Sequence, residues 1–548
     1  MTDDAVAGDE VTLLVNGRIW QGLDLDHDER QEAIAVGGGR VLAVGATREL
    51  TDRYPHERTI DLAGRTVIPG LIDAHNHAAR GGATWDAELH WAGLNSRDQA
   101  LESIRKAAAA TSPGEWITAI GGWHQTQFAG TWLPSRSELD RAAPNNPVYV
   151  QSLYEVGIAN TAAMASVGLD AAVQTLPQGT VEVDAGGAPT GVVWGLPAYN
   201  LFLAAVGTPD LQQEISGTRA MVRDYAALGL TGVCDPGGFG MSQDRYAAVR
   251  ELARSGRLDL RMRLYASATT PGSEISQVND WLDVVAADTG DDWLSMVGIG
   301  EVVHFGCHDF EGLDDFAISA PARENLFQIS SAVAARGLPM HIHAVMDDSI
   351  SAILDCWERV DAITPIGALR FSFAHADRIG ARNLRRAKAL GIGIVTDARL
   401  AFRSAASQQV WGTDVLCTVP PVCDDVAAGI TLGVGSDATR ASSHNPWLTL
   451  WWLVAGRSMD GTSQRDDAQL LSRARALSAH TEGSAWFSFE EKERGRLQPG
   501  WASDLTVLSD DYFTVPVDDI LGLHSELTMV GDRISYSSGL LADPTPAR

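Results

Sequence analysis

The chain has 548 residues, too many for one ordinary core but suited to a large barrel with a smaller attached domain. Apolar residues make up 45% and charged residues 20% of the sequence, which is typical of a globular protein and excludes a disordered chain. The net charge of −28 argues against nucleic acid or an anionic membrane as a partner, because neutralising phosphates requires a basic surface. We therefore expect a small-molecule substrate.

The N-terminus and the cysteines indicate a reducing compartment. Residues 1–10 lack the basic and apolar regions of a signal peptide, and no uncharged apolar run reaches about 18 residues, so we expect a cytoplasmic protein without a membrane span. The five cysteines are sparse and odd in number, which predicts free thiols rather than disulfides. Cys417 and Cys423 could join a metal site, although a loop role is the simpler interpretation.

Both ends of the chain carry short, alternating strand patterns. Strands are predicted at residues 11–15, 33–36, 41–44, 59–62 and 66–68, and again at 505–508, 526–530 and 533–536. Strands at both termini, with helices and strands between them, predict one β-sandwich built from residues 1–68 and 486–548.

The middle of the chain alternates apolar strands with helices. The predicted strands are 231–235, 296–305, 339–344, 370–375, 391–396 and 430–436, and the predicted helices include 321–336, 381–390 and 466–479. This alternation favours a parallel sheet covered by helices. We expect an α/β fold, a TIM-like (β/α)8 barrel over residues 69–485, with an insertion at about 85–203 over its mouth.

Histidines and carboxylates fall at the ends of the predicted strands. The first strand leads into His75-Asn76-His77, and residues i and i+2 of a strand face the same side, so both imidazoles could point at one cation. A His-x-His pair alone is as often a surface feature. Barrel active sites, however, are assembled from the carboxyl ends of several strands. Further candidates at such ends are Glu301, His341, His343, His375 and Asp437.

The sequence resembles the amidohydrolase superfamily, and most closely the amidohydrolase family 3 branch that includes N-substituted formamide deformylases. The resemblance covers nearly the whole chain. It rests on PGLIDAHNH, GGWHQTQF with LPSRSELD, GLTGVCD, IHAVMD, FAHAD, GVGSDA and GRLQPGWASDLTVL. It implies the barrel with a composite β-sandwich, one or two divalent ions, with zinc as the expected metal, and a homodimer as a common assembly.

The resemblance also implies roles for single residues. Asp437 would bind metal and act as the general base, and the histidine ligands would be His75, His77, His343 and His375. His341 lies two residues before His343 and competes with it. The His-Ala-x-x-Asp context of the family favours His343.

The chain departs from the family at the strand-4 ligand. Many relatives bridge two metals with a carboxylated lysine, but this chain has no lysine between Lys106 and Lys388. Glu301 falls at the expected position and supplies a carboxylate, with His304 and His308 as alternatives.

A second departure concerns the substrate side. Where relatives often have Asp-Gly-His, this chain reads Leu153-Tyr154-Glu155. Further candidates for substrate contacts are His444, soon after Asp437, and Trp123, in the insertion. The tryptophans there could line an aromatic pocket for a hydrophobic amide substrate.

The function expected is hydrolysis of a non-peptide carbon–nitrogen bond, in a linear amide, formamide or carbamate. A divalent ion lowers the pKa of its water to about 7, and Asp437 accepts the proton and passes it to the leaving nitrogen. One alternative is a deaminase acting on a ring amidine, although residues 342–348 lack the acid usual after strand 5 of deaminases. The other is a non-catalytic barrel that serves as a binding module.

Overall fold

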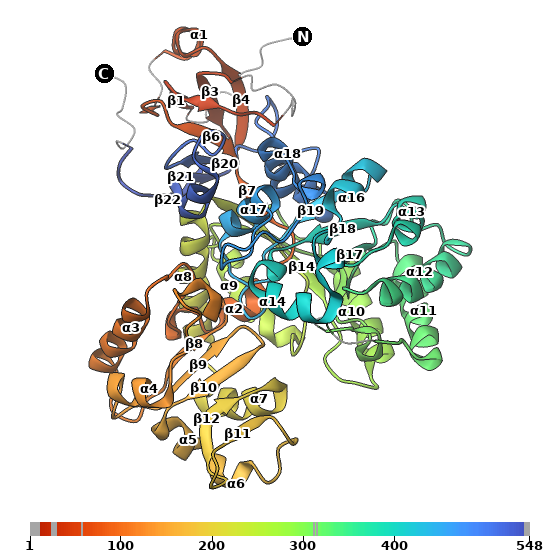
Figure 1. Ribbon diagram of the computed structural model, residues 1–548. Helices are drawn as coiled ribbons and strands as arrows, with labels where there is room; N and C mark the ends of the chain where they lie inside the picture. The colour runs from red at the N-terminus through yellow and green to blue at the C-terminus, as the bar shows by residue number, and fades with distance from the viewer. Residues whose placement is uncertain (1–10, 23–29, 56–57, 311–312, 314–315, 542–548) are drawn as a thin grey trace.

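The structure is a computed structural model that describes residues 11–22, 30–55, 58–310, 313 and 316–541 (Figure 1). The segment 1–10, for which no signal peptide is predicted, lies outside these residues. Among the helices described, none combines the length and the apolar character needed to cross a bilayer. All five cysteines are free thiols.

A β-sandwich is built from both ends of the chain, as predicted. One sheet has the order β4-β3-β1-β5, and the other has the order β2-β6-β20-β21-β22. In the second sheet β20 pairs antiparallel with β6, so the two ends of the chain share one ladder. The strands are β1 (Thr12–Val15), β2 (Arg18–Ile19), β3 (Ala33–Gly37), β4 (Arg40–Gly45), β5 (Arg58–Asp61), β6 (Thr66–Pro69), β20 (Leu505–Leu508), β21 (Ser525–Val530) and β22 (Arg533–Ser537), with helix α1 (Thr47–Arg53) beside them.

The two sheets enclose one apolar core. Leu14, Ile34, Val67, Leu505 and Leu527 pack together in it, drawing on both sheets and both ends of the chain. Burial of apolar surface is the main favourable contribution to folding, and both ends of the chain contribute buried surface to this core.

Eight parallel strands form the predicted barrel. Their order follows the chain, from β7 (Leu71–Asp73) through β13 (Leu230–Asp235), β14 (Arg261–Ala266), β15 (Leu294–Glu301), β16 (Met340–Ala344), β17 (Ser372–His375) and β18 (Gly393–Thr396) to β19 (Leu432–Val434). A backbone hydrogen bond from the Ala74 amide to the Val434 carbonyl, 2.9 Å long, joins the last strand to the first. The (β/α)8 prediction is confirmed.

Helices cover the barrel (Figure 1). They are α8 (Leu211–Ala227), α9 (Ala247–Arg254), α10 (Glu274–Ala287), α11 (Ala320–Ala335), α12 (Asp347–Asp361), α13 (Ala381–Ala389), α14 (Arg399–Trp411), α15 (Thr413–Leu416), α16 (Val422–Ala428), α17 (Pro446–Ala455) and α18 (Arg473–Ser478).

Two predicted elements have other bounds than expected. The predicted helix 466–479 is divided into a 3-10 turn at Asp467–Gln469 and α18, which continues into a π-helical turn at Ala479–Gly483. The division arises because the Ser472 side chain accepts a hydrogen bond from the Arg475 amide and caps a new start there. The predicted strand 296–305 ends at Glu301. Beyond it the His304 ring accepts a hydrogen bond from the Gly306 amide and opens a tight turn.

The insertion lies between β7 and β13 and forms its own sheet, with the order β11-β12-β10-β9-β8. Its strands are β8 (Ile117–Ile120), β9 (Val148–Ser152), β10 (Val156–Ala159), β11 (Val181–Val183) and β12 (Pro189–Val193), and its helices are α3 (Arg97–Ala110), α4 (Arg136–Ala142), α5 (Thr161–Val167), α6 (Leu169–Ala172) and α7 (Gly195–Val206). It has its own apolar clusters. The bounds of the three parts, 1–68 and 486–548 for the sandwich and 69–485 for the barrel with its insertion at about 85–203, remain predictions.

A buried ion-pair network joins the sandwich to the barrel. The Asp504 carboxylate accepts hydrogen bonds from Arg261 Nε at 2.9 Å, from Arg494 Nε at 2.8 Å and from the Gly531 amide at 2.8 Å. Burial alone would raise the pKa of Asp504, but the two guanidinium groups lower it to about 2. Removing this carboxylate would leave two buried cations with too little compensating charge.

We predict that Asp504→Ala lowers the free energy of unfolding by about 3–5 kcal/mol, because a broken buried ion pair leaves an uncompensated charge. Urea unfolding followed by circular dichroism measures it. Glu493→Gln, which removes the exposed partner of Arg40, serves as the control and should change the free energy by less than about 1 kcal/mol. Equal small effects of both variants would contradict the role given to Asp504.

Candidate metal centre

The His-x-His pair lies just beyond the first barrel strand. Because β7 ends at Asp73, His75 and His77 stand on the connection to helix α2 (Ala78–Gly82), and strand alternation is therefore the wrong reason for their convergence. Hydrogen bonds fix this connection instead. The Asp437 amide donates to the His75 carbonyl at 2.9 Å, and the Asp73 carboxylate accepts from the amides of His75 and Ser436.

Two carboxylates face both imidazoles. His75 Nε2 lies 3.6 Å from an oxygen of Glu301 and 3.6 Å from an oxygen of Asp437, while His77 Nε2 lies 3.5 Å and 3.3 Å from the same two side chains. Ligands about 2.0–2.2 Å from a tetrahedral ion are separated by roughly 3.3–3.6 Å. The four groups therefore fit a divalent cation.

Glu301 also reaches the remaining histidines. Its Oε1 lies 3.2 Å from His343 Nδ1 and 3.8 Å from His375 Nε2, and Asp437 Oδ2 lies 4.0 Å from His375 Nε2. His75 Nε2 and His375 Nε2 are buried without a hydrogen-bond partner among the described residues. Uncompensated polar atoms are costly in a protein interior, so these nitrogens are consistent with a place for an ion.

The structure thus brings together all six predicted ligands. Candidate ligand groups whose atoms lie within 4.8 Å of one another are His75–Glu301–His375, His75–His77–Asp437, Glu301–His308–His343 and His375–Asp397–Asp437. Of the alternatives, His304 turns away and its Nε2 contacts Asn325 at 3.1 Å, whereas the ring of His308 stacks on that of His343 at 3.8 Å. His341, Cys417 and Cys423 belong to none of the groups found among the described residues.

The two carboxylates are ionised. Burial would raise the pKa of Glu301, but His343, His375 and the other histidines hold it well below its usual range. Burial likewise opposes ionisation of Asp437, yet His75 and His77 hold its pKa well below the usual range. The site therefore brings carboxylate oxygens and imidazole nitrogens together, the donor set that a metal such as zinc prefers.

Two histidine rings are oriented by acceptors behind them. His77 Nδ1 lies 2.9 Å from the Gly237 carbonyl, and His375 Nδ1 lies 2.6 Å from the Asp397 carboxylate. Because both partners only accept, each ring carries a proton on Nδ1 and turns its Nε2 toward the carboxylates.

Sequence reasoning missed several of these supporting residues. Arg399 contacts Asp397 at 3.2 Å and Asp377 at 3.0 Å, and its Nε lies 3.6 Å from Asp437. Asp309 lies 3.2 Å from His343 Nε2. Asp397 and Arg399 directly follow the predicted strand 391–396, so a charged pair after an apolar strand was the available signal.

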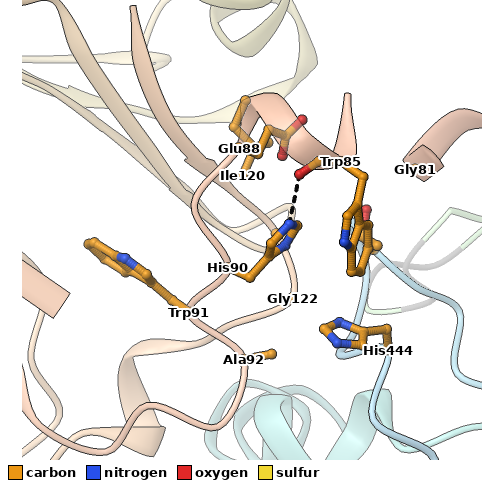
Figure 2. A pocket seen from close by; sticks show the side chains of 11 residues that line it. Gly81, Trp85, Glu88, His90, Trp91, Ala92, Ile120, Gly122 and His444 are labelled. Atoms are coloured by element: carbon orange, nitrogen blue, oxygen red, sulfur yellow. Dashed lines mark hydrogen bonds between the residues drawn. The ribbon is translucent and has the colours of Figure 1, made fainter. Parts of the chain in front are cut away.

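His444 lines a small pocket beside this centre. Figure 2 shows His444 facing Trp85 and His90, and Trp91 and Thr439 also line the pocket. Burial lowers the pKa of His444 to about 3, so the ring is neutral. The pocket adjoins the metal-ligand loops because Thr439 follows Asp437 by two residues and Gly81, another lining residue, belongs to α2.

Trp123 and Glu155 occupy different places in the insertion. Trp123 is fully buried in the insertion core, where its ring packs on Trp91 at 4.8 Å. Glu155 contacts His124 Nε2 at 2.7 Å and Arg403 Nε at 3.2 Å. Arg403 lies on α14 four positions after Arg399, whose Nε is 3.6 Å from Asp437, so Glu155 lies near the barrel rim.

The chain is similar to known proteins in sequence and in fold. A sequence profile described as "Amidohydrolase family" matches residues 58–536. The chain is 26% identical to the N-substituted formamide deformylase of Arthrobacter pascens, over 93% of this chain and 94% of that protein. It is 25% identical to the putative amidohydrolase YtcJ of Bacillus subtilis (strain 168), over 94% and 99%. An uncharacterised metal-dependent hydrolase from Pyrococcus horikoshii OT3 has a similar fold, with a TM-score of 0.66 and 18% identity over 93% of this chain and 99% of that chain.

We predict that Glu301→Gln lowers the bound divalent metal per chain, because an amide offers one weak oxygen donor where the carboxylate offers two charged ones. Metal analysis after gel filtration measures it. Glu155→Gln, a matched change outside the ligand groups, should leave the metal content as in the unchanged protein. Equal metal content in all three proteins would contradict the bridging role of Glu301.

Proposed function

We propose that this chain, which belongs to the amidohydrolase family, cleaves the carbon–nitrogen bond of a linear amide, an N-substituted formamide or a carbamate. Family membership makes the chain a metal-dependent hydrolase, and the kind of bond is our proposal. One observation carries it: two buried imidazole nitrogens without a hydrogen-bond partner face two ionised carboxylates at the carboxyl end of the barrel. The likeness to a protein named as a formamide deformylase, over nearly the full length of both chains, supports the choice of bond.

We infer that His75, His77, Glu301, His343, His375 and Asp437 hold one or two divalent ions, with zinc as the proposed metal. A divalent ion held there would lower the pKa of a water molecule to about 7 and stabilise negative charge on a carbonyl oxygen. Glu301 can serve two ions because its oxygens face both pairs of histidines.

Asp437 is the proposed general base. Its Oδ1 faces His77 Nε2, and its Oδ2 lies 3.6 Å from Arg399 Nε, whose positive charge favours the ionised form. Its backbone has a φ of 54°, in the left-handed region that costs energy for a residue with a side chain and that is common at functional sites. Asp437 takes a proton from the attacking water and delivers it to the leaving nitrogen.

The substrate side is proposed to involve the rim and the small pocket. Glu155 holds His124 and Arg403 at the rim, and neutral His444 offers a hydrogen-bond acceptor within the pocket. Trp123 acts only indirectly in this proposal, since it packs behind Trp91, which lines the pocket. A small-molecule substrate, a cytoplasmic location and a homodimer are parts of the same proposal.

We predict that Asp437→Asn lowers kcat by at least about 10³-fold while the circular dichroism spectrum stays unchanged, because an amide cannot accept the proton. Asp425→Asn is the matched control. Burial raises the pKa of Asp425 to about 8, so this carboxyl is already neutral, and it lies outside the ligand groups. Turnover by Asp437→Asn at the control's rate would remove Asp437 from the role of base.

The assay for these variants is a screen of formamides, carbamates, lactams and aminated rings with the metal-loaded protein. Formate or amine release from the linear substrates is the expected result. Ammonia release from aminated rings alone would favour the deaminase, and a chain that binds no metal and turns over nothing would favour the binding module.

We predict that Glu155→Gln raises KM about tenfold and leaves kcat and metal content unchanged, because the ion pair with Arg403 shapes binding rather than chemistry. Steady-state kinetics on the best substrate of the screen measure this. A loss of kcat with constant KM would place Glu155 in the chemistry instead.

A further inference from the structure

We propose that His341 and Ser372 form a buried relay that holds His75 in the tautomer required of a metal ligand, which makes His341 a positioning residue. The inference rests on the proposed metal centre. It gives a role to the histidine that shares strand β16 with the ligand His343 but joins no ligand group among the described residues.

The three side chains lie in a row across neighbouring elements. His75 Nδ1 is 2.9 Å from His341 Nε2, His341 Nδ1 is 2.8 Å from Ser372 Oγ, and Ser372 Oγ is 3.4 Å from the Met340 carbonyl. His341 and Ser372 are partners in the register of β16 and β17. All three side chains are buried, so water does not compete for these hydrogen bonds.

The Met340 carbonyl, at the end of this row, sets the direction in which the hydrogen bonds of the row donate. The Met340 carbonyl can only accept, so the Ser372 hydroxyl donates to it and offers its lone pair to His341 Nδ1–H. His341 Nε2 is then bare and accepts the proton of His75 Nδ1. This leaves His75 Nε2 without a proton, and that atom faces Glu301 and Asp437 without a partner.

The opposite direction would disable the ligand. If Ser372 donated to His341, the proton of His341 would point at His75 Nδ1, and His75 would carry its own proton on Nε2 in the place of the ion. The acceptors behind His77 and His375 are a carbonyl and a carboxylate, which allow one direction only. The His75 arrangement therefore depends on a group that accepts at one end and donates at the other.

The first test is the Zn²⁺ affinity of the metal-free protein, measured in competition with a chromophoric chelator. We expect His341→Leu to weaken binding about 10–100-fold, as loss of a partner behind a ligand typically does. His341→Gln should recover most of the loss, because its amide accepts from His75 and donates to Ser372. Ser372→Ala should weaken binding less than His341→Leu.

Tyr265→Phe is the matched control for packing. The Tyr265 ring lies 5.8 Å from that of His341, and its hydroxyl donates to the Phe487 carbonyl, so the variant removes a buried hydrogen bond beside the relay without touching it. It should bind Zn²⁺ as the unchanged protein does. Wild-type affinity in His341→Leu would overturn the proposal.

The second readout is the tautomer itself. ¹⁵N NMR of the metal-free protein with labelled histidine should show His75 protonated on Nδ1 in the unchanged protein and in His341→Gln, and a mixture in His341→Leu. Protonation of His75 on Nε2 in the unchanged protein would overturn the relay. If the unchanged protein binds no Zn²⁺, the proposed metal centre is wrong. The His75 tautomer measured by NMR then still tests the relay by itself.

Discussion

Two ionised carboxylates, buried among histidines, are the constraint on which the functional end of this barrel depends. Glu301 and Asp437 are almost inaccessible to water, and a buried charge without compensation is strongly unfavourable. Arg399, 3.6 Å from Asp437, supplies one nearby positive charge but also serves Asp397 and Asp377. The histidines around the two carboxylates supply the remaining compensation, and the proposed divalent cation would take over that role and supply the chemistry of the family.

The surrounding residues fix the orientation of the proposed histidine ligands. The three partners that set histidine orientation are of different kinds: a backbone carbonyl behind His77, a carboxylate behind His375 and another imidazole behind His75. Their common effect is to place the proton on Nδ1. A ligand shell oriented in this way loses less conformational freedom on binding, which favours both affinity and correct geometry.

Much of the centre could be predicted because its residues follow apolar strands at barrel spacing. That pattern singled out His343, His375 and Asp437, and it singled out Glu301 where relatives have a lysine; the structure places these four side chains close together. The supporting contacts depend on which side chains face each other across strands. His341 and Ser372 are 31 positions apart, one barrel unit, yet only the register of β16 and β17 shows them in contact. Trp123 was misleading for the same reason, since an aromatic residue in an insertion can equally belong to its core.

Glu301 changes what this centre needs in order to assemble. A carboxylated lysine forms only when its amine has combined with carbon dioxide, whereas the glutamate carries its carboxylate from synthesis. The glutamate side chain is also shorter, so the strand must bring its backbone closer to the histidines. The structure meets this demand, because β15 ends at Glu301 itself and the Glu301 amide donates to the Pro236 carbonyl at 2.7 Å. Gly238 leaves room beside Glu301. A Cβ at position 238 would lie 2.9 Å from His77 Cε1 and 3.4 Å from Glu301 Oε2. A larger residue at position 238 would therefore displace the His77 ring from its place beside Glu301, so this glycine is part of what lets the two side chains meet.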